Sequence, residues 1–140
     1  MKTQKETPVA VAVALLSVAL LFFLVNTVGN IAYIFEDASF TVHTRLWADR
    51  TVDYAEIESA ELRDSFDVGT RSSGYGSGKL MMGLFRNTEF GGYHLYAYTA
   101  SEAVVILHLQ GEDILVLSAE DSPATQELYK RIENRPCSVQ

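Results

Sequence analysis

The chain has 140 residues, of which 48% are hydrophobic, and a formal net charge of −7 at pH 7. This acidic balance argues against nucleic-acid binding and against docking on anionic lipid through a basic patch, because both depend on clustered lysine and arginine. The single cysteine excludes an internal disulfide and a cysteine-based metal cluster.

Residues 9–28 form an uncharged apolar stretch, interrupted by only three polar side chains (Ser17, Asn26 and Thr27). A helix of this length rises about 30 Å, the thickness of the hydrocarbon core of a bilayer. The stretch therefore predicts an uncleaved transmembrane anchor. Two alternatives stay open: a cleaved secretory signal peptide, for which the sequence offers only a poor cleavage site, and a buried helix, which the other elements are too few to surround.

The charges beside this stretch predict its orientation. Lys2 and Lys5 precede it, whereas the first charged residues after it are Glu36 and Asp37. By the positive-inside rule, the N-terminus is expected in the cytoplasm and the rest of the chain on the extracytoplasmic side. The predicted organisation is a basic flank (1–8), the anchor (9–28), a connector (29–37), one folded domain (38–136) and a tail (137–140).

The folded domain begins with strand patterns. Residues 40–46 alternate apolar and polar side chains, which is the period of a half-buried strand, and residues 52–54 resume the pattern after a turn. Residues 54–66 are ambiguous, because alanine and glutamate favour a helix, whereas the apolar positions also fit a strand with one bulge. The pattern alone leaves both possibilities open.

More strands are expected further along the chain. Residues 72–78 are rich in glycine and serine, which is typical of a flexible loop or turn. An apolar run at 80–85 and an aromatic run at 93–99 predict two strands. Two short apolar runs, 104–109 and 114–117, are joined by a glycine-containing turn and predict a hairpin.

The last element has a helical pattern. Ser122 can cap a helix, and Pro123 suits its first turn, where no amide hydrogen is needed. Pro136 ends it. The apolar stripe that would lie on a sheet consists of Ala124, Leu128 and Ile132.

About seven strands followed by one closing helix is the order found in pleckstrin-homology (PH) domains, and the chain resembles a bacterial PH-like family of membrane-associated proteins. The resemblance covers about residues 33–135. It implies a mainly β fold, a bent antiparallel barrel capped by a C-terminal helix and preceded here by the transmembrane helix. The similar segments are residues 52–62; 71–76 with 83–85, Gly92 and Tyr96; and 114–118 with Glu120, Asp121, Thr125, Leu128 and Tyr129.

The resemblance has three consequences. It implies that residues 57–63 form a strand, against their helix propensity. Together with the predicted anchor, it implies a single-pass protein of the bacterial cytoplasmic membrane. It supplies no catalytic residues, because the shared positions are mostly glycines and apolar residues, which specify a fold better than a function.

The region corresponding to the lipid site of phosphoinositide-binding PH domains has few cations. Arg45 and Arg50 are present, but Asp49 opposes them and the usual lysines are missing. Too few charge-assisted phosphate contacts could form. We therefore expect no phosphoinositide binding.

The glycine-rich segment does not match a phosphate-binding loop, because Ser73 and Leu80 stand where that motif needs glycine and Ser or Thr. The interpretation without a ligand is that this segment is a mobile turn between strands. The one candidate ligand site is a small cationic and aromatic rim around this segment, formed by Arg71, Tyr75, Lys79 and Arg86.

No catalytic or metal-binding set is evident. His43, His94 and His108 lie on three different predicted strands, without metal-ligand spacing, and each is expected to be a packed or surface residue. Cys137 follows Pro136 in the tail. We predict no catalytic residue, no metal and no cofactor.

The aromatic strand offers two interpretations, a packed core or an exposed binding strip. Alternation sends Tyr93 to one face and both Tyr96 and Tyr98 to the other. Packing in the core is favoured.

The leading functional hypothesis is a membrane-tethered, non-catalytic interaction or assembly module that binds a protein partner or another copy of itself by strand addition. The alternative is an extracytoplasmic sensor of a small anion or cell-envelope ligand, using the rim defined above. A third hypothesis is a small membrane-bound hydrolase, in which the histidines would supply acid–base groups.

Overall fold

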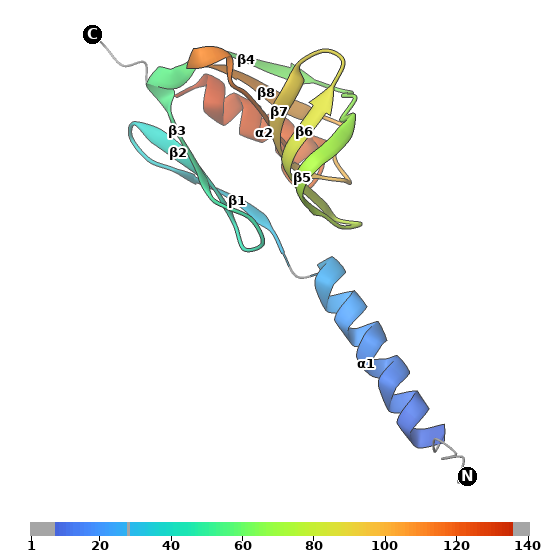
Figure 1. The fold of residues 1–140 in the computed structure, drawn as a ribbon. Coiled ribbons are helices and arrows are strands. Elements are labelled where there is room, and N and C mark those ends of the chain that lie inside the picture. The colour runs from blue at the N-terminus through green and yellow to red at the C-terminus, as the bar shows by residue number, and fades with distance from the viewer. Residues whose placement is uncertain (1–7, 28, 136–140) are drawn as a thin grey trace.

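The structure is a computed structural model that describes residues 8–27 and 29–135 (Figure 1). Its elements in chain order are α1 (Pro8–Thr27), β1 (Ile31–Phe35), β2 (Ser39–Thr44), β3 (Arg50–Asp53), the short 3-10 helix η1 (Tyr54–Glu56), β4 (Ile57–Arg63), β5 (Thr70–Gly76), β6 (Leu80–Asn87), β7 (Gly91–Tyr98), β8 (Val104–Leu109), η2 (Gln110–Glu112), β9 (Ile114–Leu117) and α2 (Ser122–Glu133). The predicted tail, 137–140, and nearly all of the basic flank lie outside the described residues.

The N-terminal helix α1 corrects the expected fold class and location. Among the described residues, no helix combines the length and the apolar character that crossing a membrane requires. The predicted transmembrane anchor, and with it the single-pass location in the bacterial cytoplasmic membrane, is contradicted by this finding.

The strands of the described chain form two sheets rather than one seven-stranded barrel. A three-stranded sheet has the order β1-β2-β3, and a six-stranded sheet has the order β4-β8-β9-β7-β6-β5. Neighbours are antiparallel except β7 and β9, which are parallel. The two additional strands are β1, which lies in the expected connector, and β5, which lies largely in the expected glycine-rich loop. The mainly β fold with a closing C-terminal helix matches the expectation.

Both faces of the six-stranded sheet are apolar. The inner core lies between the two sheets and α2, and the outer core lies on the opposite face of the larger sheet. Tyr96 and Tyr98 belong to the inner core and Tyr93 to the outer core, which confirms the alternation predicted for the aromatic strand. All three tyrosines are buried, so the exposed-strip interpretation is wrong.

Two local predictions are confirmed. The ambiguous segment is a strand, β4, entered through the 3-10 turn η1, so tertiary pairing with β8 outweighs its helix propensity. The last two strands, β8 and β9, form the antiparallel hairpin expected from their sequence.

The N-terminal cap of α2 differs from the prediction by one residue. The cap is Asp121, whose side chain accepts a hydrogen bond of 2.8 Å from the backbone amide of Ala124. The Ser122 hydroxyl instead accepts a hydrogen bond of 3.3 Å from the amide of Ala103. A carboxylate at the positive end of a helix is the stronger cap, because the helix dipole adds to the hydrogen bond.

Candidate functional site

The four residues predicted as a ligand-binding rim are spread over the β5–β6 hairpin. Arg71 pairs in register with Phe85, a residue of the outer core, whereas Tyr75 packs against the inner core. Lys79 stands just before β6 and Arg86 near its other end. The backbones of the four residues are therefore spread along the hairpin, although the Arg71 guanidinium reaches Gly76, next to Tyr75, and a shared ligand site there stays a prediction.

The ammonium group of Lys79 already has interaction partners within the protein. Its ammonium group donates a 3.1 Å hydrogen bond to the carbonyl oxygen of Gly29 and lies 6.0 Å from the centre of the Tyr98 ring. It lines a hollow of about 390 Å³ together with Glu120, among others. A carboxylate residue in the lining of the same hollow weakens the case for an anion site.

The three histidines lie in separate surroundings. The ring of His43 lies 2.8 Å from the carboxylate of Asp49, and His94 is 4.0 Å from Asp113. The ring of His108 meets Phe90 edge to face at 5.9 Å. In the part of the chain that the structure describes, no three metal-ligating side chains come together; Cys137 lies outside that part.

The cations of the β2–β3 hairpin are also partly neutralised. Arg50 donates a 2.6 Å hydrogen bond to the carboxylate of Asp113, and both side chains are about one-third exposed. Asp49 faces His43 in the same hairpin. Arg45 alone is therefore a poor basis for binding a phosphorylated lipid head group.

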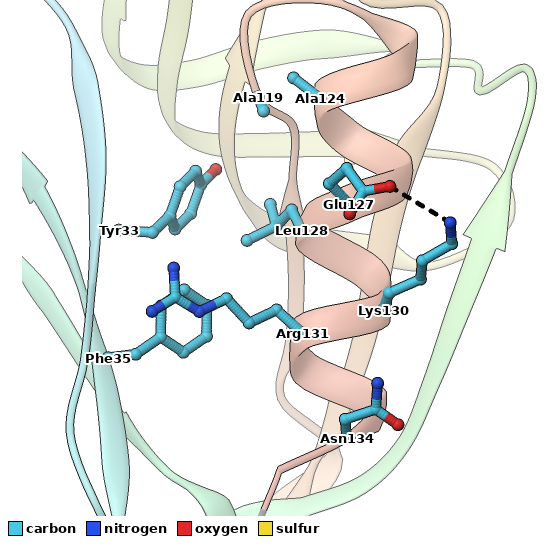
Figure 2. Close-up of a pocket in the computed structure, with 9 residues that line it drawn as sticks. All are labelled: Tyr33, Phe35, Ala119, Ala124, Glu127, Leu128, Lys130, Arg131 and Asn134. Atoms are coloured by element: carbon cyan, nitrogen blue, oxygen red, sulfur yellow. Dashed lines mark hydrogen bonds and ion pairs between the residues drawn. The ribbon is translucent and has the colours of Figure 1, made fainter.

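The best-defined candidate site is a groove between β1 and α2, about 650 Å³ in volume (Figure 2). One wall is β1, an edge strand of the three-stranded sheet, which contributes Tyr33 and Phe35. The facing wall is α2, from which Leu128 and Arg131 point toward the strand in Figure 2. The remaining lining residues are Ala119, Ala124, Glu127, Lys130 and Asn134.

Tyr33 fixes the strand side of the groove. Its hydroxyl donates a hydrogen bond of 2.6 Å to the carbonyl oxygen of Ser118, at the end of β9. Burial raises the pKa of Tyr33 well above its usual value, and the nearby Tyr98 adds to the shift. The hydroxyl therefore stays protonated and serves as a structural donor that holds β1 against the larger sheet.

Arg131 carries the charge of the groove. Its guanidinium lies over the ring of Phe35, 4.1 Å from the ring centre (Figure 2), a cation–π contact that spans the two walls. Lys130 instead pairs with Glu127 at 3.2 Å on the rim. Among the described residues no ion pair neutralises Arg131, so the groove combines apolar and polar lining residues with one unpaired cation.

The sequence patterns do not predict this groove. Tyr33 and Phe35 lie in the expected connector, and Arg131 lies on the expected closing helix without a predicted site role. Two signals were available: residues 31–35 are apolar or aromatic throughout, which is compatible with a short buried strand, and Arg131 follows Leu128 by three positions, which places both on one helix face. No local sequence pattern, however, indicates that this strand and this helix face each other.

The comparisons with known proteins agree with this architecture. The family model described as the bacterial PH domain matches residues 31–132, a span that begins at the start of β1 and ends in the last turn of α2. No curated protein and no solved structure matches the chain. Because the match covers both walls of the groove and most of the sequence, the chain belongs to the bacterial PH domain family.

Proposed function

We propose that this protein is a non-catalytic interaction module that binds a polypeptide partner in the groove between β1 and α2. The observation that carries the proposal is the groove itself, with an aromatic strand wall, a helix wall of mixed apolar and polar side chains, one unpaired cation and a volume of about 650 Å³. Sites of this kind bury apolar side chains of a partner and use a few polar groups for orientation. Membership of the bacterial PH domain family supports an interaction role of this type.

A protein partner is favoured over an anionic lipid surface. The chain carries a net charge of −7, and anionic head groups attract basic patches. Of the two arginines of the β2–β3 hairpin, Arg50 is already paired with Asp113. These charges support a module that binds neither phosphoinositides nor nucleic acid.

Site-specific photocrosslinking tests the proposal. Glu127 lines the groove, whereas its exposed neighbour Gln126 does not, so a photoreactive benzoylphenylalanine at each position gives a matched pair in the full chain. We expect polypeptide crosslinks from position 127 and few from position 126. Ala124→Trp, which fills the groove, should abolish the crosslinks from position 127.

The control for that variant is its far-UV circular dichroism, which should match the parent chain. Equal crosslinking from both positions, or crosslinks that persist in Ala124→Trp, would refute the groove as the binding site.

A further inference from the structure

The free edge of β1 presents unused backbone hydrogen-bonding groups. The Tyr98 hydroxyl accepts a bond from the Ile31 amide (2.8 Å) and donates one to the Ile31 carbonyl (3.2 Å), so both groups of Ile31 point away from β2. Strand residues alternate in this respect, and β1 is paired along one side only, by β2. The amides and carbonyls of Tyr33 and Phe35 therefore also point away from β2, along the free edge of the strand whose side chains line the groove.

These four groups have no protein partner among the described residues. A row of unpaired donors and acceptors is a template on which another extended chain can add as a strand. The groove thus combines a strand template on one wall with a helix wall of mixed apolar and polar side chains on the other.

Leu128 and Arg131 follow one another along the groove in the way that alternate residues follow one another along an added strand. In Figure 2 Tyr33 lies opposite Leu128, and Phe35 lies beside Arg131. Alternate residues of an extended chain are about 6.6 Å apart and point to the same side. A peptide lying along β1 therefore points one side chain at Leu128 and, two residues away, another at Arg131.

The charge on Arg131 selects the second side chain. Its guanidinium is stacked on Phe35 and exposed. Stacking uses the face of the planar group and leaves its N–H groups, which point outward in that plane, available to a ligand. A carboxylate can accept two parallel hydrogen bonds from these N–H groups. The Lys130–Glu127 pair on the rim contributes no net charge that would compete.

From these observations, and resting on the function proposed above, we infer that the groove binds an extended acidic peptide as an added strand on β1. The recognised pattern is an apolar residue and an Asp or Glu two positions apart, in either order, with the apolar side chain on Leu128 and Ala124 and the carboxylate on Arg131. The backbone of the peptide pairs with Tyr33 and Phe35.

A displayed library of random decapeptides, selected against the full chain, tests the pattern. We expect enrichment of peptides with an apolar residue and an acid two positions apart. Changing the acid of a selected peptide to its amide should weaken binding at least about 10-fold, since a charge-assisted pair is lost. In Arg131→Gln the acid and amide peptides should bind equally, whereas Lys130→Gln, the matched control, should keep the difference.

Hydrogen exchange separates strand addition from simple side-chain contact. Bound peptide should protect the amides of Tyr33 and Phe35, while those of Ala32 and Ile34, which face β2 in the register, should change little. A selected peptide methylated on the backbone nitrogens that face β1 should lose this protection.

The outcomes distinguish this inference from the proposed function. Selected peptides that lack the acid, or an acid preference that survives Arg131→Gln, would overturn the inference and leave an interaction module in place. Protection of Tyr33 and Phe35 that rises with protein concentration, without peptide, would overturn it in favour of a second copy of the chain. If no peptide is selected but crosslinking from position 127 persists, the extended-peptide inference is wrong and the proposed interaction function stands.

Discussion

Two glycines face each other across β5 and β6 and set how closely these strands approach. Gly74 and Gly83 are in register, with φ of 126° and 128° respectively. A Cβ atom on Gly83 would lie 2.3 Å from the carbonyl oxygen of Ser73, and one on Gly74 would lie 2.1 Å from that of Met82. Only glycine adopts this backbone conformation without strain, and only a missing side chain permits this contact.

Replacing Gly83 therefore tests the pairing at the level of a single residue. Gly83→Ala should lower the free energy of unfolding by about 2–4 kcal/mol, because the backbone is strained and the strands must separate. Urea denaturation of the full chain measures the change. The matched control is Gly92→Ala, where a Cβ would meet nothing within 4 Å and the effect should stay within about 0.5 kcal/mol; equal effects would contradict the role assigned to the glycine pair.

The loop of the β2–β3 hairpin is held by one carboxylate. Asp49 accepts hydrogen bonds from the amide of Thr44 (3.0 Å) and from the ring of His43 (2.8 Å). The Thr44 bond, followed by the His43 bond, lowers the pKa of Asp49 from its usual 3.8. Trp47, the only tryptophan of the chain, lies in this loop and is 40% exposed.

The lowered pKa fixes the pH range in which the loop loosens. A carboxyl group whose pKa falls on folding stabilises the fold above its unfolded pKa, and this contribution is lost as the pH falls through the folded value. Trp47 fluorescence should therefore stay constant from pH 7 to about 4 and change below 3.8. In Asp49→Ala the emission should be altered already at pH 7 and lack this acid step.

The control for this prediction is Asp37→Ala, which removes an exposed carboxyl group from the neighbouring β1–β2 hairpin. That variant should keep the acid step in the fluorescence of Trp47. Loss of the step in both variants would show that it reports general acid unfolding rather than release of the loop.

At the scale of the whole molecule, the six-stranded sheet must cover two apolar faces. The smaller sheet and α2 cover the inner core. Residues 64–69, which join β4 to β5, form a strap over the outer core, with Phe66 against Tyr93 at 5.6 Å between ring centres. The strap is fastened by hydrogen bonds from the Tyr93 hydroxyl to Val68 and from the Asn87 amide group to Asp67.

Removing the main apolar side chain of the strap should destabilise the entire domain. Phe66 is half-buried, so Phe66→Ala should cost about 2–3 kcal/mol, somewhat less than the usual value for a fully buried phenylalanine. Exposed outer core should also bind the dye ANS more strongly. Phe66→Leu, which keeps most of the apolar volume, should restore most of the stability; an unchanged unfolding midpoint in Phe66→Ala would contradict the role of the strap.

Local patterns were sufficient to predict much of the domain from its sequence. The hairpin of β8 and β9, the faces of the aromatic strand and the closing helix depend on the period of apolar residues and on nearby turn residues. Even so, Asp121 rather than Ser122 caps α2, because both residues are good caps and the choice depends on the distant Ala103 amide that occupies Ser122.

Other features depend on partners far away in the chain. The glycine-rich segment looked like a loop, yet residues 70–76 form a strand because the close Gly74–Gly83 pair joins it to β6. The N-terminal helix was expected to cross a membrane, which no helix in the described residues is long and apolar enough to do.

The sequence by itself determined the mainly β class, the alternation that sorts side chains between the two cores, and the closing helix, since each follows from interactions between near neighbours. Only the tertiary structure placed Phe35 against Arg131, nearly one hundred positions apart, and so created the groove. That placement depends on how the smaller sheet and α2 pack around the same core as the larger sheet, and the free energy of such long-range packing is not encoded in any local pattern.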